Sequence, residues 1–153
     1  MRTRIPQTLE AEHNELHAQL AVAMESGGKT GAAAQAAAGL VHAHFLREEE
    51  FALPPLGLLP RLAGGRLQGD TGRAMAMSER LKRELPRLRR EHRAIARALG
   101  ALVEAAKKEK KLDVARFAER LVQHARTEEE VLYPAAILVG DYLKLLLRGH
   151  LPE

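Results

Sequence analysis

The sequence predicts an all-α protein, a bundle of four helices with an internal two-fold repeat. Hydrophobic residues make up 46% of the chain but aromatic residues only 3%, so a core must be built mainly from Leu, Ala, Val and Ile. This composition favours helices, because the aromatic and β-branched residues that fill strands are scarce. A pattern of histidines and glutamates that recurs after about 80 residues indicates two matching pairs of helices.

Each copy of the repeat is a single histidine on one helix, followed by His-x-x-x-Glu near the end of the next. The first copy consists of His13, His44 and Glu48, and the second of His92, His124 and Glu128. The single histidines are 79 positions apart, and both members of the His-x-x-x-Glu pair recur after 80 positions. A proline, Pro54 or Pro134, follows six residues after each glutamate.

Helix breakers divide the first half of the chain. The first helix is expected from about 6 to 25, with Gly27-Gly28 ending it, because paired glycines are poor helix formers. The second is expected to open after Gly31 in an Ala-rich run and to end near Pro54. We expect a loop of about 20 residues, dense in Gly and Pro, to follow.

The second half repeats the arrangement. Ser78 is expected to cap the approach to a third helix that ends near Lys111, with a kink or a fresh start at Pro86. The fourth helix is expected from about 113 through 130, with a helical tail at 135–149. At 153 residues, the chain is expected to be one domain, with repeat halves at about 6–56 and 78–139.

The repeated residues lie on the inner faces of the predicted helices. On the second helix Ala37, Val41, His44, Glu48 and Phe51 are spaced by threes and fours, so a histidine and a glutamate stand where a bundle normally has Leu. Such groups are costly to bury without partners. A His and a Glu four residues apart share one helix face about 6 Å apart along the axis, and bridged metal ions lie roughly 3.5–4 Å apart. The pattern therefore predicts a two-metal site.

Other polar residues near the motif are expected to have different places. His17 lies about 40° around the helix from His13 and faces inward, so it is either a further metal ligand or a core histidine beside the site. Its counterpart in the second repeat is Ala96, which offers no ligand atom. By helical phase we expect the remaining nearby polar side chains to point away from the ligands: His42, Glu49, Glu50, Glu129, Glu130, Tyr133 and Tyr142, with His150 in solvent.

Charge and composition exclude several kinds of protein. The absence of cysteine excludes disulfides, thiolate ligands and a cysteine nucleophile. The formal net charge is +4, but the arginine stripe 83, 87, 90 and 97 lies opposite His92, so we expect a solvated face and no nucleic-acid partner. Without a signal sequence or a membrane span, a cytoplasmic location is expected.

The chain resembles the hemerythrin-like (HHE cation-binding) family from about Leu9 to Val139. The matching residues are His13, His44-x-x-x-Glu48 with Glu49 and Pro54, Glu91-His92, and His124-x-x-x-Glu128 with Leu132-Tyr133-Pro134. This resemblance implies an up-down four-helix bundle that holds two non-haem iron ions joined by an oxo or hydroxo bridge. It implies that the four histidines are terminal ligands and that Glu48 and Glu128 are bridging ligands, while manganese or zinc would also suit imidazole and carboxylate.

Two kinds of function are open for such a site, and in both a small ligand, O2, NO or H2O2, binds at an open metal position. In the first, an oxidoreductase consumes peroxide or NO in stress defence, with electrons from a reductant. In the second, the same position binds O2 reversibly for storage or sensing, or the site stores iron without turnover. The oxygen-carrier members have HxxxH and HxxxxD motifs where this chain has His92 with Ala96 and His124 with Glu128. These differences favour the redox function.

Overall fold

The structure is a computed structural model that describes residues 4–67 and 69–149. It confirms the all-α prediction, since the described residues form helices and no strand. The long helices are α1 (Gln7–Met24), α2 (Gly28–Arg47), α4 (Thr71–Lys108) and α5 (Leu112–Thr127). Two shorter helices complete the set, α3 (Leu59–Ala63) and α6 (Tyr133–Leu147).

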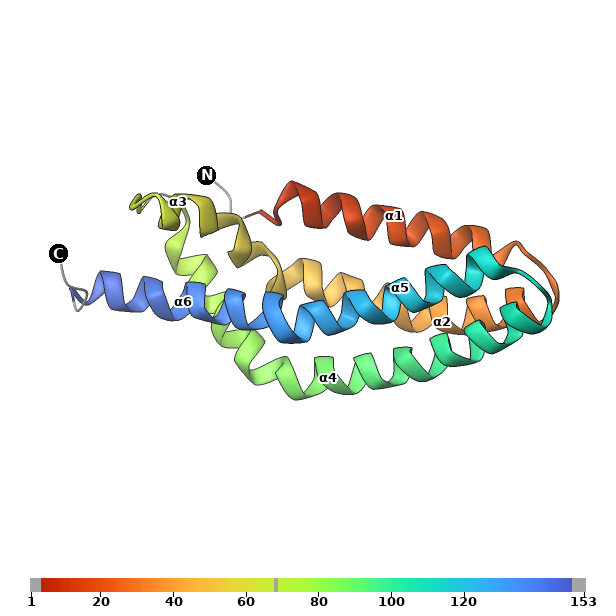
Figure 1. Ribbon diagram of the computed structural model, residues 1–153. Coiled ribbons are helices and arrows are strands. Elements are labelled where there is room, and N and C mark those ends of the chain that lie inside the picture. The colour runs from red at the N-terminus through yellow and green to blue at the C-terminus, as the bar shows by residue number, and fades with distance from the viewer. Residues whose placement is uncertain (1–3, 68, 150–153) are drawn as a thin grey trace.

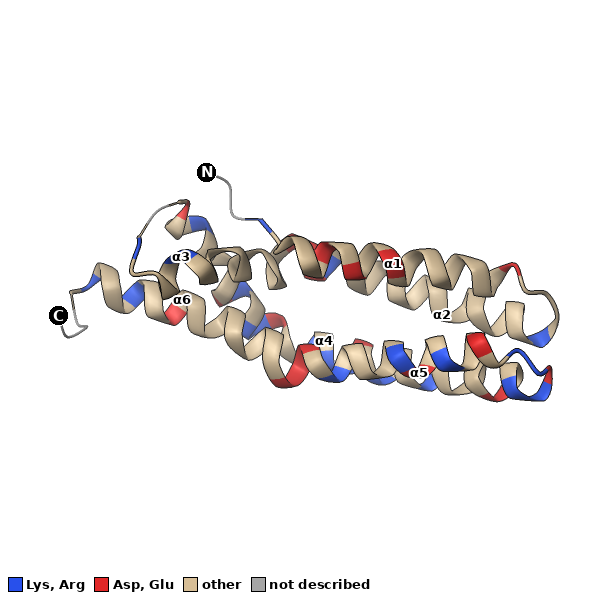
Figure 2. Cartoon of the chain, turned by 45° about the horizontal axis from the view of Figure 1, so that its top comes forward, with Lys and Arg blue, Asp and Glu red and all other residues tan. Residues whose placement is uncertain are grey.

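The long helices run alongside one another (Figure 1). Helix α1 contacts α2 and α5, and α4 contacts the same two helices, so each long helix has two neighbours. Figure 1 and Figure 2 show the α1–α2 turn and the α4–α5 turn at one end of this group, while α3 and α6 lie at the other end. Side chains that point inward from all four helices therefore meet along a common axis.

Each His-x-x-x-Glu pair leads into a π-helical turn, Glu48–Ala52 after α2 and Glu128–Leu132 after α5. In the second turn, the backbone N–H of Tyr133 donates to the carbonyl oxygen of Glu128, five residues back. Pro134 gives a physical reason, because a proline nitrogen has no hydrogen to donate and its ring collides with the carbonyl four residues earlier. The wider turn shifts the phase of the residues that follow it. Tyr133 consequently faces the same side as Glu128.

Helix α4 begins earlier than the sequence suggested and is unbroken. Ser78 is not its cap: the side chain of Asp70 accepts a hydrogen bond of 3.1 Å from the N–H of Arg73 and caps the helix there. Ser78 is buried inside α4 and donates to the carbonyl oxygen of Ala136 at 2.7 Å. Pro86 lies within α4, which bends in its first half (Figure 1). Of the two expectations for Pro86, a kink within the helix agrees with the structure, whereas a new helix does not start there.

The remaining segments extend the helical content. The expected loop of about 20 residues is shorter, because the 3₁₀ turn Pro54–Leu58 and α3 occupy its first part. The predicted tail is α6, which follows the second π-helical turn directly. His150 lies outside the described residues. Among the described helices, none has the length and apolar content needed to cross a bilayer.

Besides a small cluster that includes Leu58 and Leu143, two large apolar clusters fill the interior. One, which we call the turn-end cluster, includes Leu20, Val41, Leu99 and Leu121 from the four long helices. The other, the α6-end cluster, includes Phe51, Leu81, Leu88, Tyr133 and Ala136. Along each long helix the repeated histidine falls between residues of the two clusters or beside them. The candidate ligands are therefore sealed by hydrocarbon at both ends.

Candidate metal centre

All six residues of the repeated motif are buried in the interior. His13 comes from α1, His44 from α2, His92 from α4 and His124 from α5, and the two glutamates begin the π-helical turns. The most exposed of the six is His124, at 8%. Imidazole and carboxylate groups are seldom buried to this degree unless they are paired or bind a metal.

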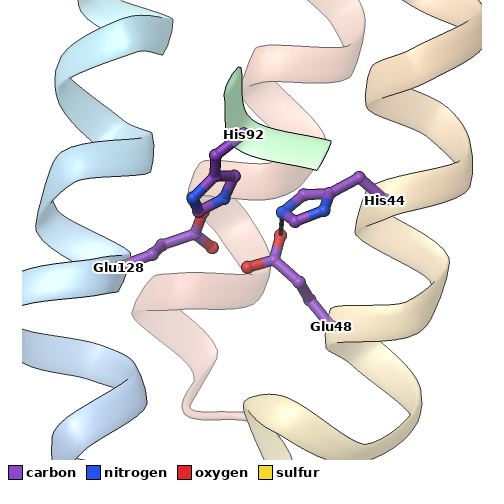
Figure 3. Close-up of side chains that lie close together, drawn as sticks. All are labelled: His44, Glu48, His92 and Glu128. Atoms are coloured by element: carbon purple, nitrogen blue, oxygen red, sulfur yellow. Dashed lines mark ion pairs between the residues drawn. The ribbon is translucent and has the colours of Figure 1, made fainter. Parts of the chain in front are cut away.

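Four of these residues form a first group, which we call the His44 group: His44, Glu48, His92 and Glu128 (Figure 3). Each offers one potential ligand atom, and these atoms all lie within 4.8 Å of one another. Nε2 of His44 is 3.3 Å from Oε1 of Glu48, and Nε2 of His92 is 3.3 Å from Oε1 of Glu128. Two imidazoles and two carboxylates therefore converge on one point, as a metal ion requires.

The second group, the His13 group, consists of His13, His124 and Glu128, again within 4.8 Å. Oε2 of Glu128 lies 3.3 Å from Nε2 of His124 and 3.6 Å from Nε2 of His13. The two oxygens of Glu128 thus face different groups, which is the position of a bridging carboxylate. Glu48 also approaches the His13 group, since its Oε1 is 3.9 Å from Nε2 of His13.

Several buried atoms in this centre have no hydrogen-bond partner among the described residues. They are Nε2 of His13, Nε2 of His124, Oε1 of Glu48 and Oε2 of Glu128. A buried polar atom without a partner costs about 1–3 kcal/mol, and more when the group is charged. All four atoms belong to the side of the ligand set that faces inward, so a cation bound there would satisfy them together. The residues present fit a metal centre.

An outer layer of carboxylates contacts the other nitrogen of each imidazole. The Nδ1 atoms pair with Glu49 at 3.4 Å for His13, with Glu91 at 3.2 Å for His44, with Glu129 at 2.9 Å for His92 and with Glu12 at 2.5 Å for His124. A carboxylate at Nδ1 fixes the ring orientation and directs Nε2 toward a metal. The four contacts repeat at offsets of 79 or 80 residues, like the candidate ligands. The side chains of Glu49 and Glu129 are 38% and 35% exposed, so they reach the surface as expected, but their contacts with His13 and His92 show that they do not point away from the site.

Tyr133 enters the centre, although helical phase predicted the opposite. Its side chain is fully buried, and its hydroxyl donates to Oε2 of Glu48 at 2.7 Å. The hydroxyl oxygen of Tyr133 also lies 3.3 Å from Nε2 of His44 and 3.3 Å from Nε2 of His92. The π-helical turn brings it there, and Pro134 is the sequence signal that could have revealed this. Leu53 stands at the corresponding position of the first half, so only the second half contributes a phenol.

Burial controls the protonation of these groups in the metal-free protein. Burial, aided by the neighbouring His92, lowers the pKa of His44 to about 3, so this imidazole is neutral at pH 7. Burial and the nearby Glu128 carboxylate raise the pKa of Glu48 well above its usual value. Burial and the Glu48 carboxylate raise the pKa of Tyr133 too, which keeps its hydroxyl protonated as a donor. The neutral imidazole is the form that binds a metal.

His17 is not brought into either group. Its ring is only partly buried and packs edge-on against Phe45, with ring centroids 4.9 Å apart. Phe45 stacks on His13 with centroids 4.0 Å apart and fills the space that a second imidazole on α1 would need. The ring of His42, which is exposed as predicted, lies 5.7 Å from that of His17. The geometry favours a packing role for His17 beside the site.

Comparisons with known proteins agree with this geometry. Residues 4–136 match the sequence model of the hemerythrin HHE cation binding domain, so most of the described chain is included. Searches of curated proteins and of solved structures gave no significant match. The matched range contains every residue of the two groups and all four outer carboxylates.

Proposed function

Because the chain belongs to the hemerythrin HHE cation-binding family, we propose that its two buried groups hold a pair of iron ions. His44, His92 and Glu48 would bind one ion, and His13 and His124 the other. Glu128, whose oxygens face both groups, would bridge them, with Glu48 as a second bridge. On this proposal the long helices form an up-down four-helix bundle with an internal two-fold repeat.

The observation that carries this proposal is the set of buried atoms without partners. No described residue satisfies two imidazole nitrogens and two carboxylate oxygens of this centre, and burying such atoms without partners costs several kcal/mol. An ordinary core would place leucines at these positions. Bound cations turn the same atoms into ligands, so the cost becomes part of the metal-binding free energy.

The donor chemistry favours iron. Four imidazoles and two carboxylates with no thiolate suit iron, manganese or zinc, and among redox-active metals imidazole with carboxylate is typical of non-haem iron. Six protein ligands for two ions leave coordination positions free for a small molecule. The bound iron would supply an Fe(II)/Fe(III) couple, which suits reaction with peroxide, NO or O2 in stress defence, with electrons from a reductant.

The chain's own residues would control the reaction in definite ways. The two apolar clusters exclude water from both ends of the centre. The outer carboxylates hold the imidazole rings in one orientation. The hydroxyl of Tyr133, close to Glu48, His44 and His92, holds a proton at the edge of the His44 group. This hydroxyl can donate its hydrogen bond to a small molecule bound there instead of to Glu48.

The experiment that tests this function is titration of iron-loaded protein with each ligand. The protein is loaded with Fe(II) without oxygen and mixed separately with O2, NO and hydrogen peroxide, while the optical spectrum and the remaining ligand are recorded. We expect peroxide or NO to be consumed over repeated additions when a reductant is present. A spectrum that forms with O2 and reverses when O2 is removed, with no consumption of peroxide or NO, would instead show reversible oxygen binding.

A further inference from the structure

The two halves of the chain differ beside the metal centre, where the second half has a cavity of about 230 Å³ between α4 and α5. His92 and Glu129 form its inner wall, and Ile95, Leu99 and Val122 contribute apolar surface. We call it the α4–α5 pocket. Glu129, which lines the pocket, contacts Nδ1 of His92, whereas Nε2 of the same ring faces Glu128.

The corresponding place in the first half is filled with rings. Ala125 and Ala96 line the α4–α5 pocket, and the residues at the matching positions of the first half, 80 and 79 earlier, are Phe45 and His17. The Phe45 ring lies flat on His13, with an angle of 8° between the planes, and the His17 ring packs against its face. Two alanines in place of these residues remove a benzene-sized ring and an imidazole.

The rim of the pocket is positively charged. Arg93 and Arg126 both line it and are exposed, whereas the matching positions of the first half are Asn14 and Leu46. Neither arginine has an ion-pair partner among the residues described. Glu129 is the one acidic group of the lining, and it is already engaged with Nδ1 of His92 at 2.9 Å.

We propose that the α4–α5 pocket binds a small aromatic anion, with its ring stacked beside His92 and its carboxylate at Arg93 and Arg126. The ring would take the place that Phe45 occupies in the first half, and the size agrees, since an apolar cavity of about 150 Å³ already accepts benzene. Guanidinium groups pair well with carboxylates, because their donors match both oxygens. The site is built from residues other than the metal ligands, His92 excepted, and does not require the metal.

The test is calorimetric titration of the full chain with benzoate and with neutral benzamide, on metal-free and on metal-loaded protein. We expect benzoate to bind at millimolar concentration or better in both forms, and more tightly than benzamide. Because the metal-free protein is included, a failure of this pocket and a failure of the metal centre give different results.

Variants identify the site. Ala125→Phe restores the ring of the first half and should abolish benzoate binding, while Ala101→Phe, an exposed position on α4 outside the pocket, should leave it unchanged. If Ala125→Phe fails to fold, Ala96→Leu provides the same test, because it fills the pocket from the α4 side. Arg93→Gln with Arg126→Gln should weaken benzoate binding by roughly tenfold or more.

The benzamide affinity should not respond to the arginine changes, and Arg97→Gln, an exposed position on the same helix outside the pocket, is their matched control. The proposal is overturned if wild-type protein does not bind benzoate, if a folded pocket-filling variant binds it as wild type does, or if benzamide binds equally well.

Discussion

The Tyr133 hydroxyl donates a hydrogen bond of 2.7 Å to Oε2 of Glu48, so a residue of the second half of the chain satisfies one oxygen of the glutamate in the first half. This contact has no counterpart in the first half, because Leu53 occupies the corresponding position. Glu48 therefore has one oxygen engaged by a phenol and one directed at the histidines, whereas both oxygens of Glu128 face histidines.

Tyr133→Phe removes that donor and keeps the ring. In metal-free protein we expect the free energy of unfolding to fall by about 1–3 kcal/mol, because Oε2 of Glu48 is left buried without a partner. Urea unfolding measures this. Tyr142→Phe, at a position 39% exposed, is the matched control and should change little. Equal effects of the two substitutions would mean that the Tyr133–Glu48 contact does not stabilise the protein.

The outer carboxylates are expected to tune metal affinity without binding the metal. Glu129→Gln weakens the contact at Nδ1 of His92, so we expect metal affinity to fall by about 10- to 100-fold. Competition with a chelator measures it. Glu130→Gln, the exposed neighbour, should behave as wild type. A Glu129 variant that retains full affinity would show that this carboxylate does not orient the ring.

The variant His17→Ala tests whether His17 packs beside the site or binds the metal. Since His17 contacts Phe45 and lies in neither ligand group, we expect the metal content and the optical spectrum of the loaded protein to stay unchanged. His13→Ala, one turn earlier on α1, should lose metal from the His13 group. Loss of metal from the His17 variant would instead show that His17 binds the metal.

Glu109 provides a prediction for the fold far from the centre. The hydroxyl and the N–H of Thr30 donate to Oε1 of Glu109 at 2.5 and 2.7 Å, so this carboxylate caps the start of α2. The approach is close, because a Cβ on Gly28 would lie 2.2 Å from Oε2 of Glu109. The Thr30 hydrogen bonds hold the pKa of Glu109 below its usual value of 4.5.

A lowered pKa in the folded protein means that Glu109 stabilises the fold above pH 4.5 and that this stabilisation is lost as the pH falls through the lowered value. Glu109→Gln should therefore lower the melting temperature at pH 7, with the difference from wild type shrinking in acid. Glu104→Gln, an exposed position on α4, controls for the charge change. A difference independent of pH would contradict a role for the ionised carboxylate.

The convergence of the six motif residues was predictable from residue spacing, and the misplacement of Tyr133 has a physical cause in the π-helical turn before it. The motif residues converge because a His and a Glu four positions apart share a helix face, which needs only an unbroken helix up to Glu48 and Glu128. Beyond those glutamates the phase changes, so Tyr133 was misplaced by the assumption of regular helix through residues 128–132. Glu49 and Glu129 were misplaced for another reason, because each contacts an imidazole of a neighbouring helix, His13 or His92.

Other differences came from tertiary packing. The space beside His13 is taken by Phe45, which helical phase alone could not reveal for His17. The early start of α4 depends on the Asp70 cap, a local signal hidden in a segment rich in glycine. Ser78 was read as a cap but bonds across to Ala136, 58 residues away in sequence.

Metal analysis of iron-loaded protein shows whether the two groups together hold two metal ions. We expect about two irons per chain in wild type, because the ligands form two groups. Glu128→Ala should lose metal from both, since Glu128 is the residue that the groups share. Glu50→Ala, at an exposed position, should retain wild-type content. One zinc per chain with no iron uptake, or a Glu128→Ala variant that retains two irons, would show that the two groups do not hold an iron pair bridged by Glu128.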